Sequence, residues 1–194
     1  MSRTRRVPTA EGKAEVREKG SVFLSFLLPA GSREEAEARL AELKRRFADA
    51  THHCWAWRLG EEERSSDDGE PAGTAGMPIL QVLRGAELWD ALCVVVRWFG
   101  GTKLGKGGLA RAYALAAREA LAGCVPVEQR VRRELHLTLD YPRIGAVKRL
   151  LRPPEIELVT EAYGAQVELT LLVAEDRREE LLAALADLSL MPDA

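Results

Sequence analysis

The stretch "GMPILQVLRGAELWDALCVVVRWFGGTKLG", residues 76–105, decides the fold. Its first part, "MPILQVLRGAE", predicts a short helix. The following "DALCVVVRWFG" predicts a buried central strand, because apolar and β-branched residues follow one another without polar interruption. This strand leaves through glycines into "GLARAYALAAREALAG", which predicts a long alanine-rich helix with Gly123 near its end. Strands that alternate with helices in this way indicate a compact α+β domain.

The residues upstream extend this domain. Residues 12–30 predict two strands joined near Lys19 and Gly20. "GSREEAEARLAELKRRFADA" predicts a helix capped by Ser32, with acidic residues in its first turn and basic residues in its last. Residues 51–59 alternate and predict a strand. Its two faces carry His53, Trp55 and Trp57 on one side and His52, Cys54 and Ala56 on the other.

A change of composition at "VPVEQRVRREL" predicts a domain boundary, which divides the chain into residues 1–130 and 131–194. The second part predicts the order strand, helix, strand, strand, helix. These elements are expected at residues 133–139, 144–151, 156–163, 166–173 and 176–188. The βαββα order is typical of a ferredoxin-like domain with its helices on one sheet face.

Composition excludes several classes of protein. The 194 residues are 46% apolar and 30% charged, which is ordinary for a globular chain, and the formal net charge of -2 means that nucleic-acid binding would need a local basic surface. The three cysteines, which form no CxxC pair, are expected to be small buried residues. No apolar run reaches the roughly 20 residues that span a bilayer, so we expect a cytoplasmic protein without membrane contact.

The glycine-rich segment after the central strand predicts phosphate binding. Glycines permit close backbone approach, the start of a helix offers free amides, and the lysines add charge. The pattern matches neither GxxxxGK[ST] nor GxGxxG, and the alternative is that the glycines only permit a tight strand-to-helix connection. Trp98 and Phe99 point to opposite strand faces, so one of them is available for stacking on a base. The expected phosphate-binding residues are Arg97, Trp98, Phe99, Gly100, Gly101, Thr102, Lys103, Gly105, Lys106, Gly107, Gly108 and Arg111.

The acidic segment "SSDDGEPAGTAG", residues 65–76, allows two interpretations. Its carboxylates, with a histidine from the preceding strand, have the chemistry of a cation site or an acid–base pair. The alternative, which we favour, is a structured turn whose carboxylates pair with Lys103, Lys106 or Arg97. We expect it to shape a polar groove beside the glycine-rich segment. The residues expected to do so are His52, Asp67, Asp68, Gly69, Glu70, Pro71, Gly73, Thr74 and Gly76.

Three ordered motifs resemble one known family. The run at residues 76–105, the segment "DDGEPAGTAG" and the strand "HHCWAW" are similar to the signature of the IMPACT family, in particular its bacterial YigZ-like branch. The resemblance covers roughly the whole chain. It implies an N-terminal βαβ domain with a left-handed crossover, as in a ribosomal-protein domain and domain IV of elongation factor G. It also implies a C-terminal domain like a later domain of that factor.

The resemblance suggests regulation of translation through RNA or a ribosome-associated component. Eukaryotic members restrain a kinase that senses uncharged tRNA, but we expect no such role here, because the chain has no room for their additional partner-binding domain. We therefore expect a translation-linked or stress-linked binding protein without catalytic residues, cofactor or metal. A protein partner on the C-terminal sheet is also considered. The alternative is an enzyme that acts on a phosphorylated small molecule or nucleotide through the acidic segment, with a divalent metal.

Overall fold

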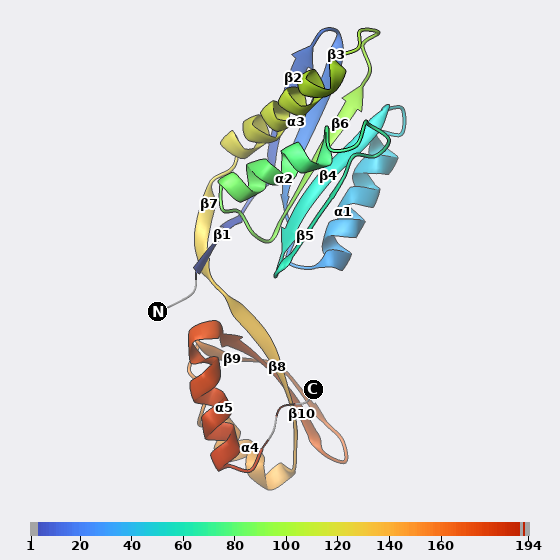
Figure 1. Cartoon of the computed structure of the whole chain (residues 1–194). Coiled ribbons are helices and arrows are strands. Elements are labelled where there is room, and N and C mark those ends of the chain that lie inside the picture. Colours follow the sequence, from blue (N-terminus) through green and yellow to red (C-terminus); the bar gives the residue numbers. More distant parts are fainter. Residues whose placement is uncertain (1–3, 191, 193–194) are drawn as a thin grey trace. The chain divides into compact units, whose positions relative to one another are not determined.

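The computed structural model describes residues 4–190 and 192. Its contacts divide the chain into two compact units, an N-terminal unit, Arg5–Glu128, and a C-terminal unit that begins at Gln129. Both units combine strands with helices (Figure 1), so the predicted two-domain α+β class is confirmed. The division lies next to the boundary that the sequence predicts between residues 130 and 131.

A five-stranded sheet forms the centre of the N-terminal unit. Its strands lie in the order β2-β3-β6-β4-β5, and all neighbouring pairs are antiparallel. These strands are β2 (Gly12–Glu18), β3 (Ser21–Pro29), β6 (Ala91–Trp98), β4 (His52–Leu59) and β5 (Glu62–Ser66). The apolar β6 is central, as predicted, because only a strand flanked on both edges and covered on both faces removes so many apolar side chains from water.

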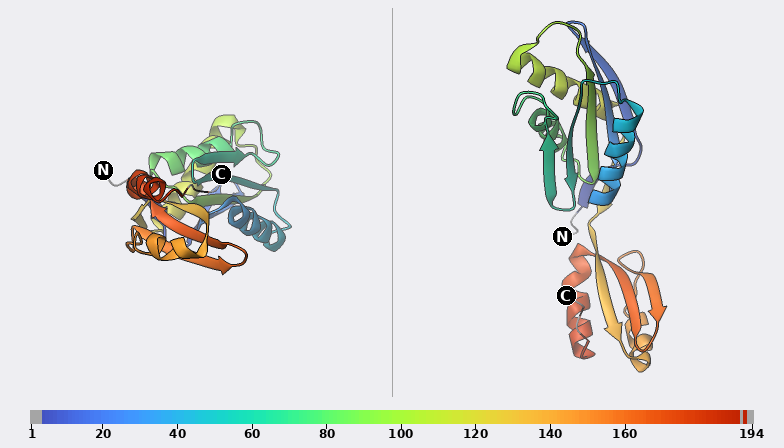
Figure 2. Two further views of the ribbon diagram at one scale, coloured as in Figure 1. Left: turned by 90° about the horizontal axis from the view of Figure 1, so that it is seen from below. Right: turned by 90° about the vertical axis from the view of Figure 1, so that its right-hand side faces the viewer.

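Helices cover both faces of this sheet. α1 (Arg33–Arg46) packs on one face, and α2 (Gly76–Gly85) and α3 (Gly105–Ala122) pack on the other (Figure 2). The side chain of Ser32 accepts a hydrogen bond from the amide of Glu35 and caps α1, as the sequence predicts. An apolar core lies on each face of the sheet, and successive residues of β6 point into one core and then the other. Cys93 and Val95 face α2 and α3, whereas Val94 and Val96 face α1.

The turn between β2 and β3 fixes the position of the glycine-rich segment. Lys19 and Gly20 have φ values of 47° and 83°, the left-handed conformation that two-residue hairpin turns require. Gly20 lies directly against Gly100, because a Cβ placed on Gly100 would be 1.9 Å from the carbonyl carbon of Gly20. The segment that follows β6 is therefore packed backbone to backbone against the hairpin turn.

The sequence reading missed three short strands. β5, of which only Ser65 and Ser66 belong to the acidic segment, pairs with β4 at the sheet edge. β1 (Thr4–Pro8) and β7 (Pro126–Arg130) form a separate two-stranded sheet. These segments are mostly polar or very short, so they lack the apolar alternation by which strands are recognised.

The C-terminal unit has the predicted βαββα order. The antiparallel sheet β8-β10-β9 packs with two helices around one apolar core. Its elements are β8 (Arg132–Leu139), α4 (Ile144–Lys148) after a 3₁₀ turn at Tyr141–Arg143, β9 (Ile156–Tyr163), β10 (Val167–Ala174), a 3₁₀ turn at Glu175–Arg177 and α5 (Arg178–Asp187).

The outward residues of this smaller sheet are mostly polar. Glu168 and Thr170 of β10 point away from the core, and Thr170 lies 3.2 Å from a ring nitrogen of His136 in β8. In the described part of this unit, the large exposed apolar side chains are Val159 and Tyr163 on the edge strand β9 and Tyr141. A protein partner on this sheet stays a prediction, and a polar surface rather than an apolar one would receive it.

Two simpler expectations concern the described residues as a whole. Cys54, Cys93 and Cys124 are all buried free thiols, as predicted. Within residues 4–190 and 192, none of the helices is both long and apolar enough to cross a membrane.

Candidate functional site

Asp67 organises the acidic loop by capping α2. Its carboxylate accepts hydrogen bonds from the backbone amides of Gly73 at 2.7 Å and of Ala75 and Gly76 at 2.8 Å each. Partial burial opposes ionisation of Asp67, but these three amides outweigh it and hold the pKa of the carboxyl below its usual value. The first turn of α2 has no other side-chain cap. Asp67 is therefore a structural carboxylate.

Asp68 fastens the same loop to β4. Its side chain accepts a hydrogen bond of 2.7 Å from the amide of His53 and lies 3.3 Å from the ammonium group of Lys44. Its carbonyl oxygen lies 2.8 Å from Nδ1 of His52. Asp68 has a φ of 44° and is followed by Gly69 at 87°, so the chain reverses sharply here.

Glu70 and Arg97 form a buried ion pair. Their side chains are only 4% and 5% exposed, and the pair joins the acidic loop to the end of β6. The hydroxyl of Tyr113 in α3 donates to Glu70 at 2.8 Å, while Arg97 donates to the hydroxyl of Ser21 at 3.2 Å. Of the two roles that the sequence leaves open for Arg97, phosphate contact and pairing with a loop carboxylate, the structure shows the second. Arg97 is not an available surface cation.

The buried groups around this ion pair do not ionise near neutrality. Burial raises the pKa of the Cys54 thiol to about 12, and burial also raises the pKa of the Tyr113 hydroxyl far above its usual value. The sulfur of Cys54 instead lies within hydrogen-bond distance of two oxygens, the carbonyl oxygen of Asp67 at 3.0 Å and the hydroxyl of Tyr113 at 3.3 Å. These groups are hydrogen-bonding partners of the loop and of one another. Sequence reasoning missed Tyr113 and Ser21 because they lie far from the loop in the chain.

The remaining loop residues shape its backbone. The hydroxyl of Thr74 donates to the carbonyl oxygen of Pro71 at 2.6 Å. A Cβ on Gly76 would lie 2.7 Å from the amide nitrogen of Ser66, so α2 begins in close contact with β5. Within the residues that the structure describes, His, Cys, Asp and Glu nowhere gather in a group of three that would hold a metal ion.

The glycine-rich loop, residues 99–108, differs from the acidic loop in that its charged side chains are exposed. Gly101 and Gly105 have φ values of 86° and 68°, which glycine adopts without strain. α3 begins at Gly105 after Leu104, whose side chain forms no capping hydrogen bond. Its first amides are therefore free to bind another acceptor. Lys103, Lys106 and Arg111 are exposed, and among residues 4–190 and 192 they have no hydrogen-bond or ion-pair partner.

Phe99, rather than Trp98, is the exposed aromatic residue. Phe99 is 47% exposed, and its ring lies 5.5 Å from the guanidinium of Arg97. Trp98 lies on the α1 side of the sheet, where its indole donates to Asp49 at 2.9 Å and its ring meets Phe47 edge to face. Only Phe99 is placed to stack on a ligand beside the loop.

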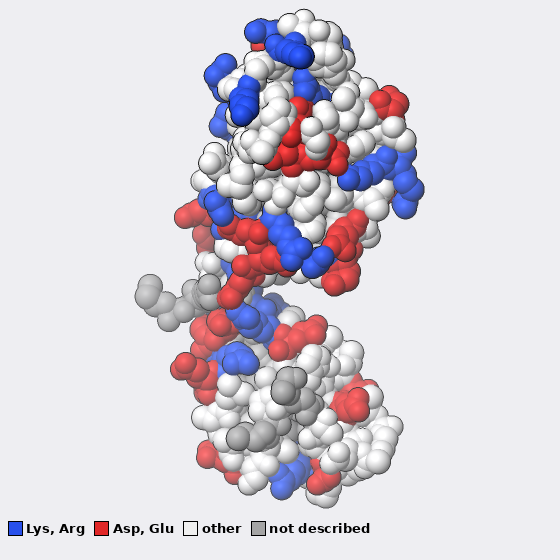
Figure 3. Space-filling view, turned by 45° about the vertical axis from the view of Figure 1, so that its right-hand side comes forward, with Lys and Arg blue, Asp and Glu red and all other residues white. Residues whose placement is uncertain are grey.

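A cavity of about 140 Å³ lies between the start of α3 and the β2–β3 turn. It is lined by Val16, Glu18, Lys19, Leu104, Gly108, Arg111, Ala112 and Leu115. Lys and Arg side chains gather at the end of the N-terminal unit that holds this turn and the glycine-rich loop, at the top of Figure 3. Sequence reasoning missed Lys19, although it expected the turn there. No residue of the acidic loop lines the cavity, so a groove shared by both loops stays a prediction.

Comparison with known proteins identifies this architecture. A profile of the Impact N-terminal domain matches residues 19–121, and a profile described as a domain of unknown function, DUF1949, matches residues 137–189. The Bacillus subtilis IMPACT family member YvyE is 37% identical over 84% of this chain and 77% of its own, and Escherichia coli YigZ is 35% identical over 88% and 86%. A crystal structure of a hypothetical protein, 32% identical, matches with a TM-score of 0.76 over 100% of this chain and 98% of its own.

The fold and the two loops thus define a two-domain α+β protein whose larger unit is an Impact N-terminal domain. The match covers both units, and several relatives align over most of their own length. The chain belongs to the IMPACT family.

Proposed function

We propose that this protein is a cytoplasmic translation-linked or stress-linked regulator that binds RNA or a ribosome-associated component. Contact is made through the glycine-rich loop and the cavity beside it. The translation link rests on what membership of the IMPACT family implies, namely a likeness to domains of ribosomal proteins and of elongation factor G. The site itself rests on the residues described above.

The observation that carries the proposal is a group of unpaired cations on an otherwise balanced surface. Lys19, Lys103, Lys106 and Arg111 surround the start of α3, and none has an ion-pair partner among the described residues. The whole chain carries a formal net charge of -2, so this local surplus of positive charge is not a consequence of composition. Phosphate groups are the anions that such a cluster suits best in a protein of this fold.

Two neighbouring features favour a nucleic-acid backbone with an accessible base. The uncapped amides of α3 point toward the loop, where the helix dipole favours an anion. Phe99 supplies an exposed aromatic face next to these donors. Unpaired bases stack on aromatic side chains, whereas bases in a duplex do not, so single-stranded or looped RNA is the expected ligand.

In the enzyme alternative the acidic loop supplies the carboxylates, and all three of its carboxylates already have hydrogen-bond or ion-pair partners. Asp67 is engaged by three amides, Asp68 by the His53 amide and Lys44, and Glu70 by Arg97 and Tyr113. A general base needs a lone pair that is directed at the substrate, and a metal site needs several such groups together. We therefore assign the acidic loop a structural role that supports the binding surface.

The test is fluorescence-anisotropy titration with labelled tRNA, single-stranded RNA and DNA over a series of salt concentrations. Wild-type protein is expected to bind RNA with a steep salt dependence. The variant Lys103→Ala/Lys106→Ala should bind about tenfold more weakly, and its slope of log K against log salt should be shallower by about 1.4, since each phosphate contact to a single strand contributes about 0.7.

A matched control removes two other exposed cations. Arg45 in α1 and Arg149 after α4 are both exposed and lie in other elements. Arg45→Ala/Arg149→Ala makes the same change of net charge, so it should retain the wild-type salt slope. Equal losses of RNA affinity in both double variants would show that the effect comes from the net charge of the protein and not from the position of the two lysines. Failure of the wild-type protein to bind any of the three nucleic acids at low salt would exclude direct nucleic-acid contact.

A further inference from the structure

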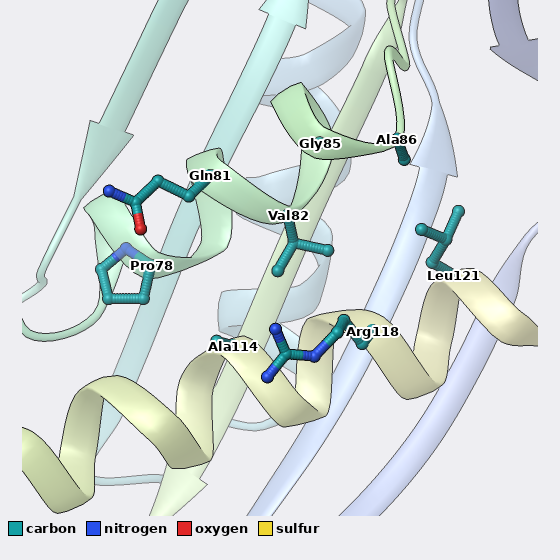
Figure 4. A pocket seen from close by; sticks show the side chains of 8 residues that line it. All are labelled: Pro78, Gln81, Val82, Gly85, Ala86, Ala114, Arg118 and Leu121. Carbon is teal, nitrogen blue, oxygen red and sulfur yellow. The ribbon is translucent and has the colours of Figure 1, made fainter.

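A second and larger cavity lies on the outer side of the N-terminal unit, between α2 and α3. Its volume is about 350 Å³ (Figure 4). It is lined by Pro78, Gln81, Val82, Gly85, Ala86, Ala114, Arg118 and Leu121. The proposed RNA contact uses none of these residues.

Small residues on both helices create this cavity. A Cβ placed on Gly85 would meet no atom within 4 Å, and Ala114 on α3 lies on the other side of the space. Val82 and Leu121 provide the larger apolar surface. The volume falls at the lower end of the range of about 300–1,000 Å³ in which small organic ligands are bound, and the mostly apolar lining with few polar groups is typical of such sites.

The polar groups at the cavity select for a negative charge. Arg118 is exposed and lies at the cavity, and among residues 4–190 and 192 its guanidinium has no hydrogen-bond or ion-pair partner. Arg6, which is not among the lining residues, donates a hydrogen bond of 3.0 Å to the carbonyl oxygen of Ala86. No Asp or Glu lines the cavity, and Gln81 adds an amide at its rim. A guanidinium beside an apolar cavity matches a carboxylate, which it binds in a bidentate manner.

We propose that this cavity binds a small carboxylic acid with an apolar body, held by its carboxylate on Arg118 and by its body between Val82 and Leu121. Gln81 supplies a second hydrogen bond at the rim. The assignment is independent of the RNA contact, because one cavity lies between α3 and α2, the other lies between α3 and the β2–β3 hairpin, and they share no lining residue. Ligand binding between α2 and α3 would adjust the packing of two helices that cover the same sheet face.

The test is isothermal titration calorimetry on the full chain with 3-phenylpropionate, with octanoate as an aliphatic probe and 3-phenylpropan-1-ol as a neutral analogue. We expect saturable binding of both acids and at least tenfold weaker binding of the alcohol. Arg118→Gln should weaken acid binding about tenfold, because it removes the charge and the bidentate donor. Arg111→Gln, a change of the same type on the same helix, should leave acid binding unchanged and weaken RNA binding.

A second variant tests the position without changing charge. Ala114→Leu places a helix-favouring side chain into the cavity and should abolish acid binding while RNA binding and the circular-dichroism melting temperature stay within error. Equal binding of acid and alcohol, or wild-type affinity in Arg118→Gln, would overturn the carboxylate assignment. Absence of saturable binding by the wild-type protein at millimolar acid would overturn the site.

A peptide arm separates a free acid from a protein terminus. A tripeptide that ends in phenylalanine and its C-terminally amidated form are titrated in the same way. The proposal expects the peptide acid to bind no more tightly than 3-phenylpropionate. If the peptide acid binds more tightly than 3-phenylpropionate, the proposal of a small acid is overturned, and a protein C-terminus becomes the expected ligand. Loss of RNA binding in Arg111→Gln, with acid binding intact, identifies the two sites as separate. Wild-type protein that binds RNA but neither acid would overturn the acid site alone, and wild-type protein that binds the acids but no RNA would overturn the RNA contact alone.

Discussion

The two loops beside α2 and α3 carry charges of opposite sign, and they differ in whether these charges have partners. The acidic loop has three carboxylates, and each is bound by backbone amides, a lysine or a buried arginine. The glycine-rich loop and the first turns of α3 have three cations, and none is paired among the described residues. A charged residue in the sequence therefore indicates an available charge only where the fold leaves it without a partner.

The comparison also separates two kinds of structural order. The acidic loop is held by its side chains, since Asp67, Asp68 and Glu70 each connect it to another element. The glycine-rich loop is held by its backbone, where Gly100 meets Gly20. Side chains in the first loop are therefore needed for stability, and those in the second are free to contact a ligand. The following three predictions test this contrast, in order of decreasing effect.

The largest effect is expected at the buried ion pair. Glu70→Ala leaves the Arg97 guanidinium buried without a counterion and should lower the free energy of unfolding by about 3–5 kcal/mol. Tryptophan fluorescence in urea measures this unit alone, because all four tryptophans lie within Arg5–Glu128. The double variant Glu70→Leu/Arg97→Met removes both charges and should be more stable than Glu70→Ala. A double variant as unstable as the single one would show that the loss in Glu70→Ala does not come from the unpaired charge of Arg97.

A smaller loss is expected at the cap of α2. Asp67→Ala removes three hydrogen bonds and should cost about 2 kcal/mol at pH 7. The folded-state pKa of Asp67 lies below its ordinary value of 3.8, so its contribution is fully present above that pH and disappears as the pH falls through the lower folded pKa. Urea titrations of wild type and variant should therefore converge as the pH falls below 3.8 and through the lower folded-state pKa.

An exposed acidic residue provides the control for this pH dependence. Glu42 in α1 is exposed and belongs to no ion pair that the structure describes. Glu42→Ala should change the free energy of unfolding by less than about 0.5 kcal/mol at either pH. A difference between wild type and Asp67→Ala that stays constant from pH 7 to pH 3 would mean that the capping oxygen, and not its charge, stabilises the helix.

The smallest effect is expected in the glycine-rich loop. Lys103→Ala/Lys106→Ala should change the free energy of unfolding by no more than about 0.5 kcal/mol, and the change should be stabilising, because Lys106 places a positive charge in the first turn of α3. The same fluorescence titration measures it. A loss of stability greater than about 1 kcal/mol would show that the lysines hold the loop and would remove the contrast with the acidic loop.

The sequence predicts the elements whose apolar residues repeat regularly. The hairpin at β2 and β3, the helix α1 with its Ser32 cap and the central strand β6 all follow from local patterns. The strands β1, β5 and β7 were missed because short polar segments become strands only when a neighbouring strand supplies hydrogen-bond partners.

The candidate site is less visible in the sequence because its contacts connect distant residues. Glu70, Arg97 and Tyr113 come from a loop, a strand and a helix, and no local pattern pairs them. One signal was available for Arg97. It shares a strand face with Cys93 and Val95, which lie beneath α2 and α3, so its burial follows from the period of two.

The two edges of the five-stranded sheet have a further consequence for the protein in solution. β2 reads "GKAEVRE" and β5 reads "EERSS", so both outer strands carry charges of both signs along their length. A second chain that extended the sheet at either edge would have to place its own side chains beside these charges. The polar composition that hid β5 from sequence reading thus protects the sheet from edge-to-edge aggregation.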